Sequence, residues 1–359
     1  MRRIVFVIEQ LYGGGAERAT AALMNEMCKE AEIHLISTYA HDPSKDYPTD
    51  ERVFKHCFEM PRTNAMDTFV KRIAFLRRTI SDIDPMCVVS LAGCGTDTLL
   101  TVSLFGKRIP LILSERNDPR HSPESKLLRI LRMCTYSVSK GLVFQTKEAQ
   151  SYFPSFMTRK STVICNPITG NLPPAFDGVR KARIINCCRL MPQKNLDLLI
   201  DSFADISAEF PEVQLEIWGE GREKKRLEEK IGMMNLENRV FLPGYSSNIY
   251  EQMRECAMFV SSSDYEGISN SMLEAVSLGV PTICTDCPAG GARETIQNGI
   301  NGLLVPVGDR KALADAMRKI LREPDFAKKL SLNGRKLRDD ISVAVIAEKW
   351  IDYFDKIAE

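Results

Sequence analysis

Residues 263–274 read Ser-Asp-Tyr-Glu-Gly-Ile-Ser-Asn-Ser-Met-Leu-Glu, and they follow an apolar run at 257–261 that predicts a buried strand. Ser271 and Glu274 have the spacing of a capping box, which predicts that a helix begins here. We therefore expect Glu266 in the loop after the strand and Glu274 in the first turn of the helix. Because the first N–H groups of a helix lack intrahelical partners, this loop is a candidate site for phosphate oxygens between two carboxylates. A helix cap beside a solvated loop is the alternative.

A second candidate loop stands near the start of the chain. The apolar run 3–8 predicts a strand buried on both faces, and Gly13, Gly14 and Gly15 separate it from a helical pattern that reaches Met27. Glycines at a helix N-terminus let a ligand approach the backbone. The pattern is neither a dinucleotide fingerprint nor a P-loop, and a tight turn without a ligand is the alternative.

Strand patterns recur in two series, and helical patterns separate most of them. The first series continues with 33–37, 86–91, 109–114, 142–144 and 162–165, and the second comprises 184–187, 213–218, 240–242, 257–261, 281–284 and 303–305. This alternation predicts an α/β protein with two doubly wound, Rossmann-like parallel sheets.

The Pro-rich stretch 166–174 is the expected linker between two domains. We expect an N-terminal domain at 1–170 and a C-terminal domain at 171–341, facing each other across a cleft. One face of the final helical pattern is apolar, which predicts that residues 342–359 cross back to the N-terminal domain.

Ligands bind at the carboxyl ends of the strands in such sheets, and several polar loops are expected there. Arg189 and Lys194 follow the first strand of the second series, where a guanidinium and an ammonium together suit a diphosphate. Gly219 and Tyr245 lie in turns at the same edge. In the first series, the loop 114–119 combines a carboxylate, a guanidinium and an amide, which predicts an acceptor or diphosphate site. A surface cation pair and a polar turn are the structural alternatives.

The composition excludes several classes of protein. With 359 residues, 44% of them hydrophobic, and a net charge of +1, the chain is a soluble globular protein rather than a dedicated nucleic-acid binder. Its 11 cysteines form no disulfide framework, which indicates a reducing compartment. A cytoplasmic location is expected, because no signal peptide or membrane-spanning run is evident. The C-x-x-C at Cys284 and Cys287 lacks two further zinc ligands nearby, so we expect buried thiols and no metal site.

Two predicted helices are basic as well as amphipathic. Arg77 and Arg78 lie largely outside the apolar stripe of the first, and Arg129 and Arg132 share a face of the second with Lys126. A core stripe with a solvated face is one interpretation. The other is peripheral attachment to anionic lipid on the inner face of the cell membrane, to which each basic residue contributes roughly 1 kcal/mol.

Taken together, these motifs resemble the retaining glycosyltransferases of family four, which have the two-Rossmann-domain GT-B architecture. The resemblance covers nearly the whole chain and is most specific at Arg189 with Lys194, at the Glu266–Glu274 pair and at 298–306. It implies that Arg189 and Lys194 hold the donor diphosphate, that Glu266 lies against the donor sugar and that Glu274 binds the ribose. The other donor-binding residues expected on these grounds are Gly14, Gly15, Gly219, Tyr245, Gly267, Ile268, Ser269 and Asn270.

Residues 285–294, 14–18 and 114–117 resemble a narrower subset, which builds bacterial surface polysaccharides or lipid-linked oligosaccharides, commonly from UDP-galactose, UDP-GalNAc or UDP-GlcNAc. Another subset of the family has histidine at the position of Glu115. The role of that histidine in sugar positioning therefore cannot be carried over to this sequence. The expected acceptor-binding residues are Glu17, Arg18, Glu115, Arg116 and Asn117.

The resemblance implies metal-independent transfer of a hexose or N-acetylhexosamine from a UDP-sugar, with retention of configuration, to a glycan or polyprenyl-diphosphate-linked acceptor. No residue stands out as a covalent nucleophile, in keeping with the front-face attack that the family implies. Alternatives are a UDP-sugar 2-epimerase or a phosphorylase on the same architecture, and a non-catalytic subunit that binds nucleotide sugars.

Overall fold

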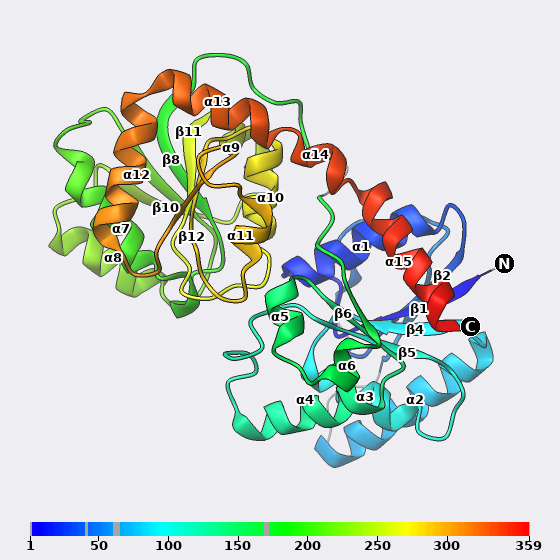
Figure 1. Ribbon diagram of the computed structural model, residues 1–359. Helices are drawn as coiled ribbons and strands as arrows, with labels where there is room; N and C mark the ends of the chain where they lie inside the picture. The colour runs from blue at the N-terminus through cyan, green and yellow to red at the C-terminus, as the bar shows by residue number, and fades with distance from the viewer. Residues whose placement is uncertain (1, 40–41, 60–64, 169–171, 359) are drawn as a thin grey trace. The chain divides into compact units, whose positions relative to one another are not determined.

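The computed structural model describes residues 2–39, 42–59, 65–168 and 172–358, and it divides the chain into two compact units. Unit 1 comprises Met1–Gly170 together with Ile341–Glu359, and unit 2 comprises Asn171–Asp340. The last residues of the chain therefore rejoin the unit that contains the first, as the colours of Figure 1 show. The expected linker includes residues 169–171, which lie outside the described residues.

Unit 1 is built on seven parallel strands, which are β1 (Arg3–Ile8), β2 (Glu32–Ser37), β3 (Phe54–Cys57), β4 (Cys87–Ser90), β5 (Leu111–Glu115), β6 (Gly141–Phe144) and β7 (Ser161–Val163). They lie in the order β3-β2-β1-β4-β5-β6-β7. The order reverses between β1 and β4, where a doubly wound sheet opens a ligand crevice at the carboxyl ends of its strands.

The helices of unit 1 are α1 (Gly15–Met27), α2 (Ala65–Ile83), α3 (Cys94–Ser103), α4 (Lys126–Val138), α5 (Lys147–Ser151), α6 (Ser155–Thr158) and α15 (Val343–Ala358). In Figure 1, α1 and α15 cover one face of the sheet and α2, α3 and α4 cover the other. Trp350, Tyr353 and Phe354 of α15 are buried, and Phe354 contacts Phe6 of β1 edge-on. The prediction that the final helix returns to the N-terminal domain is thus confirmed.

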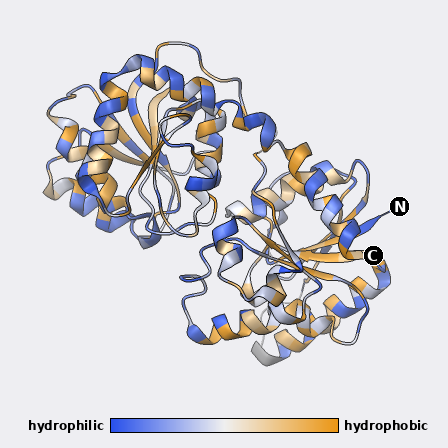
Figure 2. Cartoon of the chain, in the orientation of Figure 1, coloured by the Kyte–Doolittle hydropathy of each residue, from blue (hydrophilic) through white to orange (hydrophobic). Residues whose placement is uncertain are grey.

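Unit 2 has six parallel strands, which are β8 (Lys181–Cys187), β9 (Gln214–Trp218), β10 (Val240–Gly244), β11 (Cys256–Ser261), β12 (Thr282–Thr285) and β13 (Leu303–Val305). Their order, β10-β9-β8-β11-β12-β13, reverses between β8 and β11. The helices are α7 (Leu196–Ser207), α8 (Lys224–Met233), α9 (Ile249–Arg254), α10 (Asn270–Ser277), α11 (Gly291–Thr295), α12 (Arg310–Arg322), α13 (Pro324–Gly334) and α14 (Leu337–Asp340). Figure 2 shows the strands of both units as hydrophobic segments beneath helices that are hydrophilic outside.

The expected α/β architecture is confirmed in both units, and the strands lie close to the positions of their apolar runs. The exception is β3, which was not predicted. Phe54 and Lys55 are exposed on this edge strand, so its sequence lacks the apolar run of a strand buried on both faces. None of the helices in the described ranges combines the length and apolarity needed to cross a membrane.

Candidate functional site

The strongest candidate site lies at the carboxyl edge of the unit 2 sheet, where its strand order reverses. The loop after β8 contains Arg189 and Lys194, and the loop after the neighbouring strand β11 contains Glu266. Because β8 and β11 are parallel neighbours, the two loops leave the sheet side by side. The predicted cation pair and the first predicted carboxylate are therefore brought together.

Hydrogen bonds join these two loops along their length. The amide of Asp264 donates to the carbonyl of Gln193 at 2.9 Å, and the Gln193 side chain donates to the carbonyl of Tyr265 at 2.8 Å. Asn195 donates to the Asp264 carboxylate at 2.7 Å, and the Ser262 hydroxyl donates to the carbonyl of Lys194 at 2.9 Å. These four bonds hold the loop that carries Lys194 against the loop that carries Glu266 before any ligand arrives.

An ion pair stands at the centre of the site. The Lys194 ammonium donates to Glu266, whose carboxylate also accepts from the Ser263 hydroxyl at 3.3 Å. Both charged side chains are mostly buried, with 13% and 21% of their surface exposed. Burial lowers the pKa of Lys194 and the adjacent carboxylate raises it, and the net shift is upward. Lys194 is therefore fully cationic at neutral pH, and Arg189 is exposed close by.

Helix α10 begins one turn after Glu266, and its cap differs from the predicted one. The N-cap is Ser269, whose hydroxyl accepts from the amide of Met272 at 3.4 Å. Ser271 is already inside the helix, and its hydroxyl donates to the carbonyl of Cys187 at the end of β8. The capping-box prediction is wrong, because this hydroxyl serves a tertiary contact. Glu274 accordingly lies in the second turn.

Glu274 is buried, with 3% of its surface exposed, and the Tyr250 hydroxyl of α9 donates to its Oε1 at 3.1 Å. A buried carboxylate needs such donors, because an uncompensated charge is costly in the protein interior. Tyr250 was not recognised in the sequence, since a tyrosine within a short helix gives no signal of its partner. The structure identifies it as a residue that holds the Glu274 carboxylate in place.

Replacing Glu274 by glutamine preserves the side-chain shape and the oxygen that faces Tyr250 but removes the charge. If Glu274 binds a ribose, affinity for UDP should fall about tenfold, or ~1.4 kcal/mol, because hydrogen bonds to charged groups are the stronger ones. Titration calorimetry with UDP measures this change, and a thermal melt serves as the folding control. Unchanged affinity would make Glu274 a purely structural residue.

Glycines allow the strand-end loops of unit 2 to pack backbone against backbone. Gly219 follows β9 with φ +131°, and a Cβ atom built there would lie 1.9 Å from the carbonyl oxygen of Cys188. The amide of Gly219 donates to the carbonyl of Gly244, and the amide of Cys188 donates to the carbonyl of Trp218. Gly219 thus holds the start of the Arg189–Lys194 loop in place through its lack of a side chain.

Gly219→Ala should destabilise unit 2 by about 1–3 kcal/mol beyond the cost of the left-handed backbone, because the new methyl group meets a fixed carbonyl. Gly299→Ala is the matched control, since Gly299 also has a positive φ (+75°) but has nothing within 4 Å of an added Cβ. Guanidinium unfolding followed at Trp218 compares the two variants. Equal losses would show that the close approach to Cys188 is unimportant.

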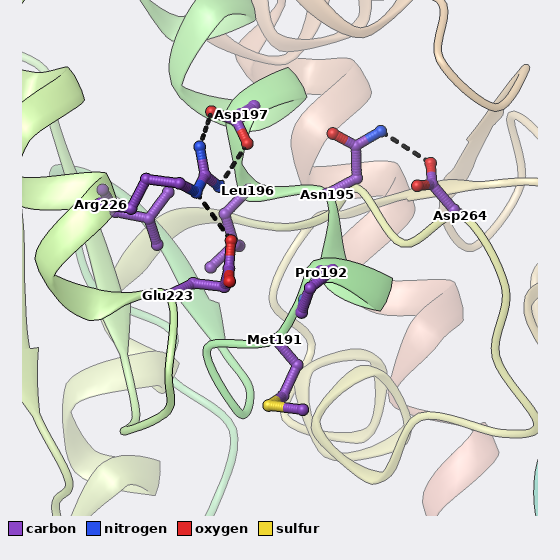
Figure 3. Close-up of a pocket in the computed structure, with 9 residues that line it drawn as sticks. Met191, Pro192, Asn195, Leu196, Asp197, Glu223, Arg226 and Asp264 are labelled. Atoms are coloured by element: carbon purple, nitrogen blue, oxygen red, sulfur yellow. Dashed lines mark hydrogen bonds and ion pairs between the residues drawn. The ribbon is translucent and has the colours of Figure 1, made fainter. Parts of the chain in front are cut away.

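A cavity of about 290 Å³ adjoins the same loop. Figure 3 shows its charged lining: Arg226 points toward Asp197 and Glu223, at 2.6 and 2.7 Å, while Asn195 on the other side is bonded to Asp264. Because Arg226 is held by two carboxylates, this cavity presents no available cation to a phosphate. We therefore assign it to support of the loop rather than to ligand binding.

In unit 1, the carboxyl edge gathers the second set of predicted residues. Gly14 is the N-cap of α1 and Glu17 lies in its first turn, directly after β1. Arg116 follows β5, and its guanidinium donates to Asn166 and lies near Glu17 and Glu115. Burial lowers the pKa of Arg116 to about 10, so that it stays cationic at neutral pH.

Glu115 has a structural role in unit 1, and its predicted contact with an acceptor stays a prediction. It is 8% exposed, and its Oε2 accepts from Arg132 at 2.9 Å. Arg132, which is 1% exposed, also donates to the carbonyls of Pro119 and Ser122. Together the two residues fasten the loop that carries Arg116 to helix α4. The prediction that Arg132 contacts lipid headgroups is wrong, because its guanidinium is buried and both of its terminal nitrogens donate within unit 1.

The other three predicted membrane residues differ in their surroundings. Arg77 is exposed but donates to the carbonyls of Ser103 and Phe105, and Arg129 donates to the carbonyl of Pro123. Arg78 is exposed on α2. Membrane contact by these arginines stays a prediction, although Arg77 and Arg129 donate to carbonyls of unit 1 and Arg78 lies 3.7 Å from the Asp82 carboxylate.

Two carboxylates near this edge were not singled out in the sequence. Asp97 of α3 is fully buried, accepts from the Ser90 hydroxyl at 2.6 Å and has no partner for its Oδ2 among the described residues. Burial raises the pKa of Asp97 well above its usual range. Asp118 is also buried and pairs with His121 in the loop after β5. Their burial could not be read from residue types alone.

The C-x-x-C thiols are buried within unit 2. Cys284 and Cys287 are 2% and 3% exposed, and burial raises the pKa of Cys287 to about 12. In the described part of the chain, no group of three or more His, Cys, Asp and Glu side chains is arranged to hold a metal ion. The expectation that the reaction needs no metal stays a prediction.

Comparison with known proteins finds one matching family and several similar chains. The family described as Glycosyl transferases group 1 matches residues 178–337, which is nearly all of unit 2. A Campylobacter jejuni protein, GalNAc-alpha-(1->4)-GalNAc-alpha-(1->3)-diNAcBac-PP-undecaprenol alpha-1,4-N-acetyl-D-galactosaminyltransferase, is 25% identical over 98% of both chains. A second protein from that organism, N-acetylgalactosamine-N,N'-diacetylbacillosaminyl-diphospho-undecaprenol 4-alpha-N-acetylgalactosaminyltransferase, is 26% identical over 98% of this chain and 100% of its own.

Among solved structures, the Anabaena protein HepE in complex with UDP and glucose superimposes with a TM-score of 0.84 at 19% identity, covering 99% of this chain and 100% of its own. This likeness shows the same two-domain fold.

Proposed function

We propose that the protein transfers a hexose or N-acetylhexosamine from a UDP-sugar to a lipid-linked glycan acceptor, since residues 178–337 match the family described as Glycosyl transferases group 1. The observation that carries the proposal is the Lys194 ammonium, held beside Glu266 and near Arg189 at the reversal of the unit 2 sheet. The names of the two Campylobacter relatives support the choice of acceptor, since both include undecaprenol carried by a diphosphate.

The proposed chemistry is electrostatic. When the bond between the sugar and the diphosphate breaks, negative charge develops on the departing UDP. Arg189 and Lys194 stabilise that charge, helped by amides at the start of α10, and Glu274 holds the ribose. Because two fixed cations can do this work, we propose that turnover does not need a metal ion and is unchanged by EDTA. Loss of activity on chelation, restored by a divalent cation, would contradict this part.

We assign the donor to unit 2 and the acceptor to unit 1. Arg116 is a cation at the carboxyl edge of unit 1 and lies near Glu17 of α1, so it suits an anionic acceptor group. We also propose retention of anomeric configuration and action at a membrane surface, since a lipid-linked acceptor resides there.

The test is mass spectrometry of the products formed from UDP-galactose, UDP-GalNAc, UDP-GlcNAc and UDP-glucose with lipid-diphosphate-linked glycans. The expected result is an acceptor heavier by one sugar with one preferred donor, and NMR of the new linkage reports retention. Conversion of UDP-sugar without acceptor would indicate an epimerase, and a requirement for free phosphate would indicate a phosphorylase. UDP binding without any transfer would indicate a non-catalytic subunit.

A further inference from the structure

The solvent-facing side of helix α4 is apolar along its whole length. Leu127, Ile130 and Val138 are 72%, 62% and 70% exposed. Together with Cys134 they follow one another at intervals of three or four residues, so they share one face of the helix. Figure 2 shows hydrophobic residues at intervals along α4. An apolar stripe of this kind on a soluble protein marks an interaction surface.

The stripe continues into a cavity of about 760 Å³ between α3, α4 and the end of α15. Val102 and Phe105 stand at this cavity and are 45% and 83% exposed. Leu111, the first residue of β5, also lines the cavity, which therefore lies at the amino end of the strand. The loop with Arg116 lies at the other end. We call Val102, Phe105, Leu127, Ile130 and Val138 the α4 face.

The charged side chains in the two chain segments that form the α4 face are all positive. Residues 98–114 and 125–146 contain no aspartate or glutamate. Their exposed cations are Lys107, Arg108, Lys126 and Lys140, and the side chains of these four have no ion-pair or hydrogen-bond partner among the described residues. An apolar stripe bordered by unpaired cations is complementary to an anionic lipid surface, which offers hydrocarbon below negatively charged headgroups.

We propose that the α4 face docks on an anionic lipid bilayer, with its apolar side chains inserted among the acyl chains and its four cations at the headgroups. A helix of 13 residues is about 20 Å long and can lie in the plane of the interface. A second copy of this chain is a poorer occupant, because a symmetric contact would bring the same cations against each other.

Docking has a consequence for the reaction, and this step rests on the proposed function. Helix α4 begins directly after the loop 116–125, and Arg132 fastens that loop to the helix. A bilayer that receives α4 would therefore have Arg116 and Asn117 near its headgroups, where the diphosphate of a lipid-linked acceptor lies.

Flotation of the full-length protein with phosphatidylcholine vesicles, with and without phosphatidylglycerol, tests the docking. One variant removes exposed apolar groups (Phe105→Ser, Ile130→Ser, Val138→Ser), and another reverses charge (Lys107→Glu, Arg108→Glu, Lys140→Glu). The wild type should float with anionic vesicles. Since each cation contributes roughly fivefold near such a surface, loss of three should weaken partitioning by about a hundredfold. The apolar variant should lose binding even at low salt.

Matched controls in unit 2 replace exposed apolar residues (Val179→Ser, Met233→Ser) or reverse exposed lysines (Lys225→Glu, Lys328→Glu, Lys329→Glu), and both should float like the wild type. Binding that persists in both α4-face variants, or a wild type that never floats, would overturn the proposal. So would a wild-type dimer in light scattering that the apolar variant abolishes. Sugar transfer to a short, water-soluble acceptor should be unchanged in both α4-face variants. If the wild type transferred no sugar to any acceptor, the proposed function would be contradicted, while the flotation result would remain valid.

Discussion

Lys194→Ala should lower kcat by about 10²–10³, because it removes a preorganised cation from the position where the departing diphosphate gains charge. The ammonium is already held by Glu266, and the loops around it are joined through backbone and amide groups that the substitution leaves intact. Glu266 keeps the Ser263 hydroxyl as a donor and has 21% of its side chain exposed, so it is less dependent on its cation than the more deeply buried Glu115. Folding should therefore survive, and the main loss should appear in kcat.

Steady-state kinetics with saturating donor and acceptor measures this loss. Lys311→Ala is the matched control, since Lys311 is a lysine of unit 2 that pairs with Asp315 on the surface of α12. That control should behave like the wild type. If Lys194→Ala also turned over at the wild-type rate, the electrostatic account of the site would fail.

Arg132→Met should destabilise unit 1 by about 3–5 kcal/mol, because it leaves the buried Glu115 carboxylate without its cation. The same change releases the carbonyls of Pro119 and Ser122. Adding Glu115→Gln to Arg132→Met should recover much of the loss, since the uncompensated charge is then gone.

The sequence contains two tryptophans, Trp218 in unit 2 and Trp350 in unit 1, so guanidinium unfolding in a Trp218→Phe background follows unit 1 alone. Arg77→Met is the control, because Arg77 is exposed on the neighbouring helix α2 and has no carboxylate partner among the described residues. Equal losses for Arg77→Met and Arg132→Met would contradict the importance of the buried pair.

The fold was largely predictable because parallel strands buried on both faces are continuous apolar runs, and such runs are visible without any partner information. The loops after those strands were predictable for the same reason. Once β8 and β11 are recognised, Arg189, Lys194 and Glu266 must emerge at one edge. Edge strand β3 lacks that signal, since Phe54 and Lys55 face solvent.

What could not be predicted depends on tertiary partners. Ser271 has the spacing of a cap but bonds to the end of β8, and Arg132 has the pattern of a surface cation but is buried against Glu115. Both errors have one physical cause: a polar side chain at a helix start or on a helix face can serve its own helix, the solvent or a distant segment. Spacing along the chain does not distinguish these outcomes.

The position of α15 has a consequence for biosynthesis. During translation the ribosome releases every strand of unit 1 early, but the helix that buries Trp350, Tyr353 and Phe354 against that unit emerges only after all of unit 2. Unit 2 is complete before then, since its residues end at Asp340. The nascent chain should therefore finish its second half first, with the first half waiting for the closing segment and exposed meanwhile to chaperones.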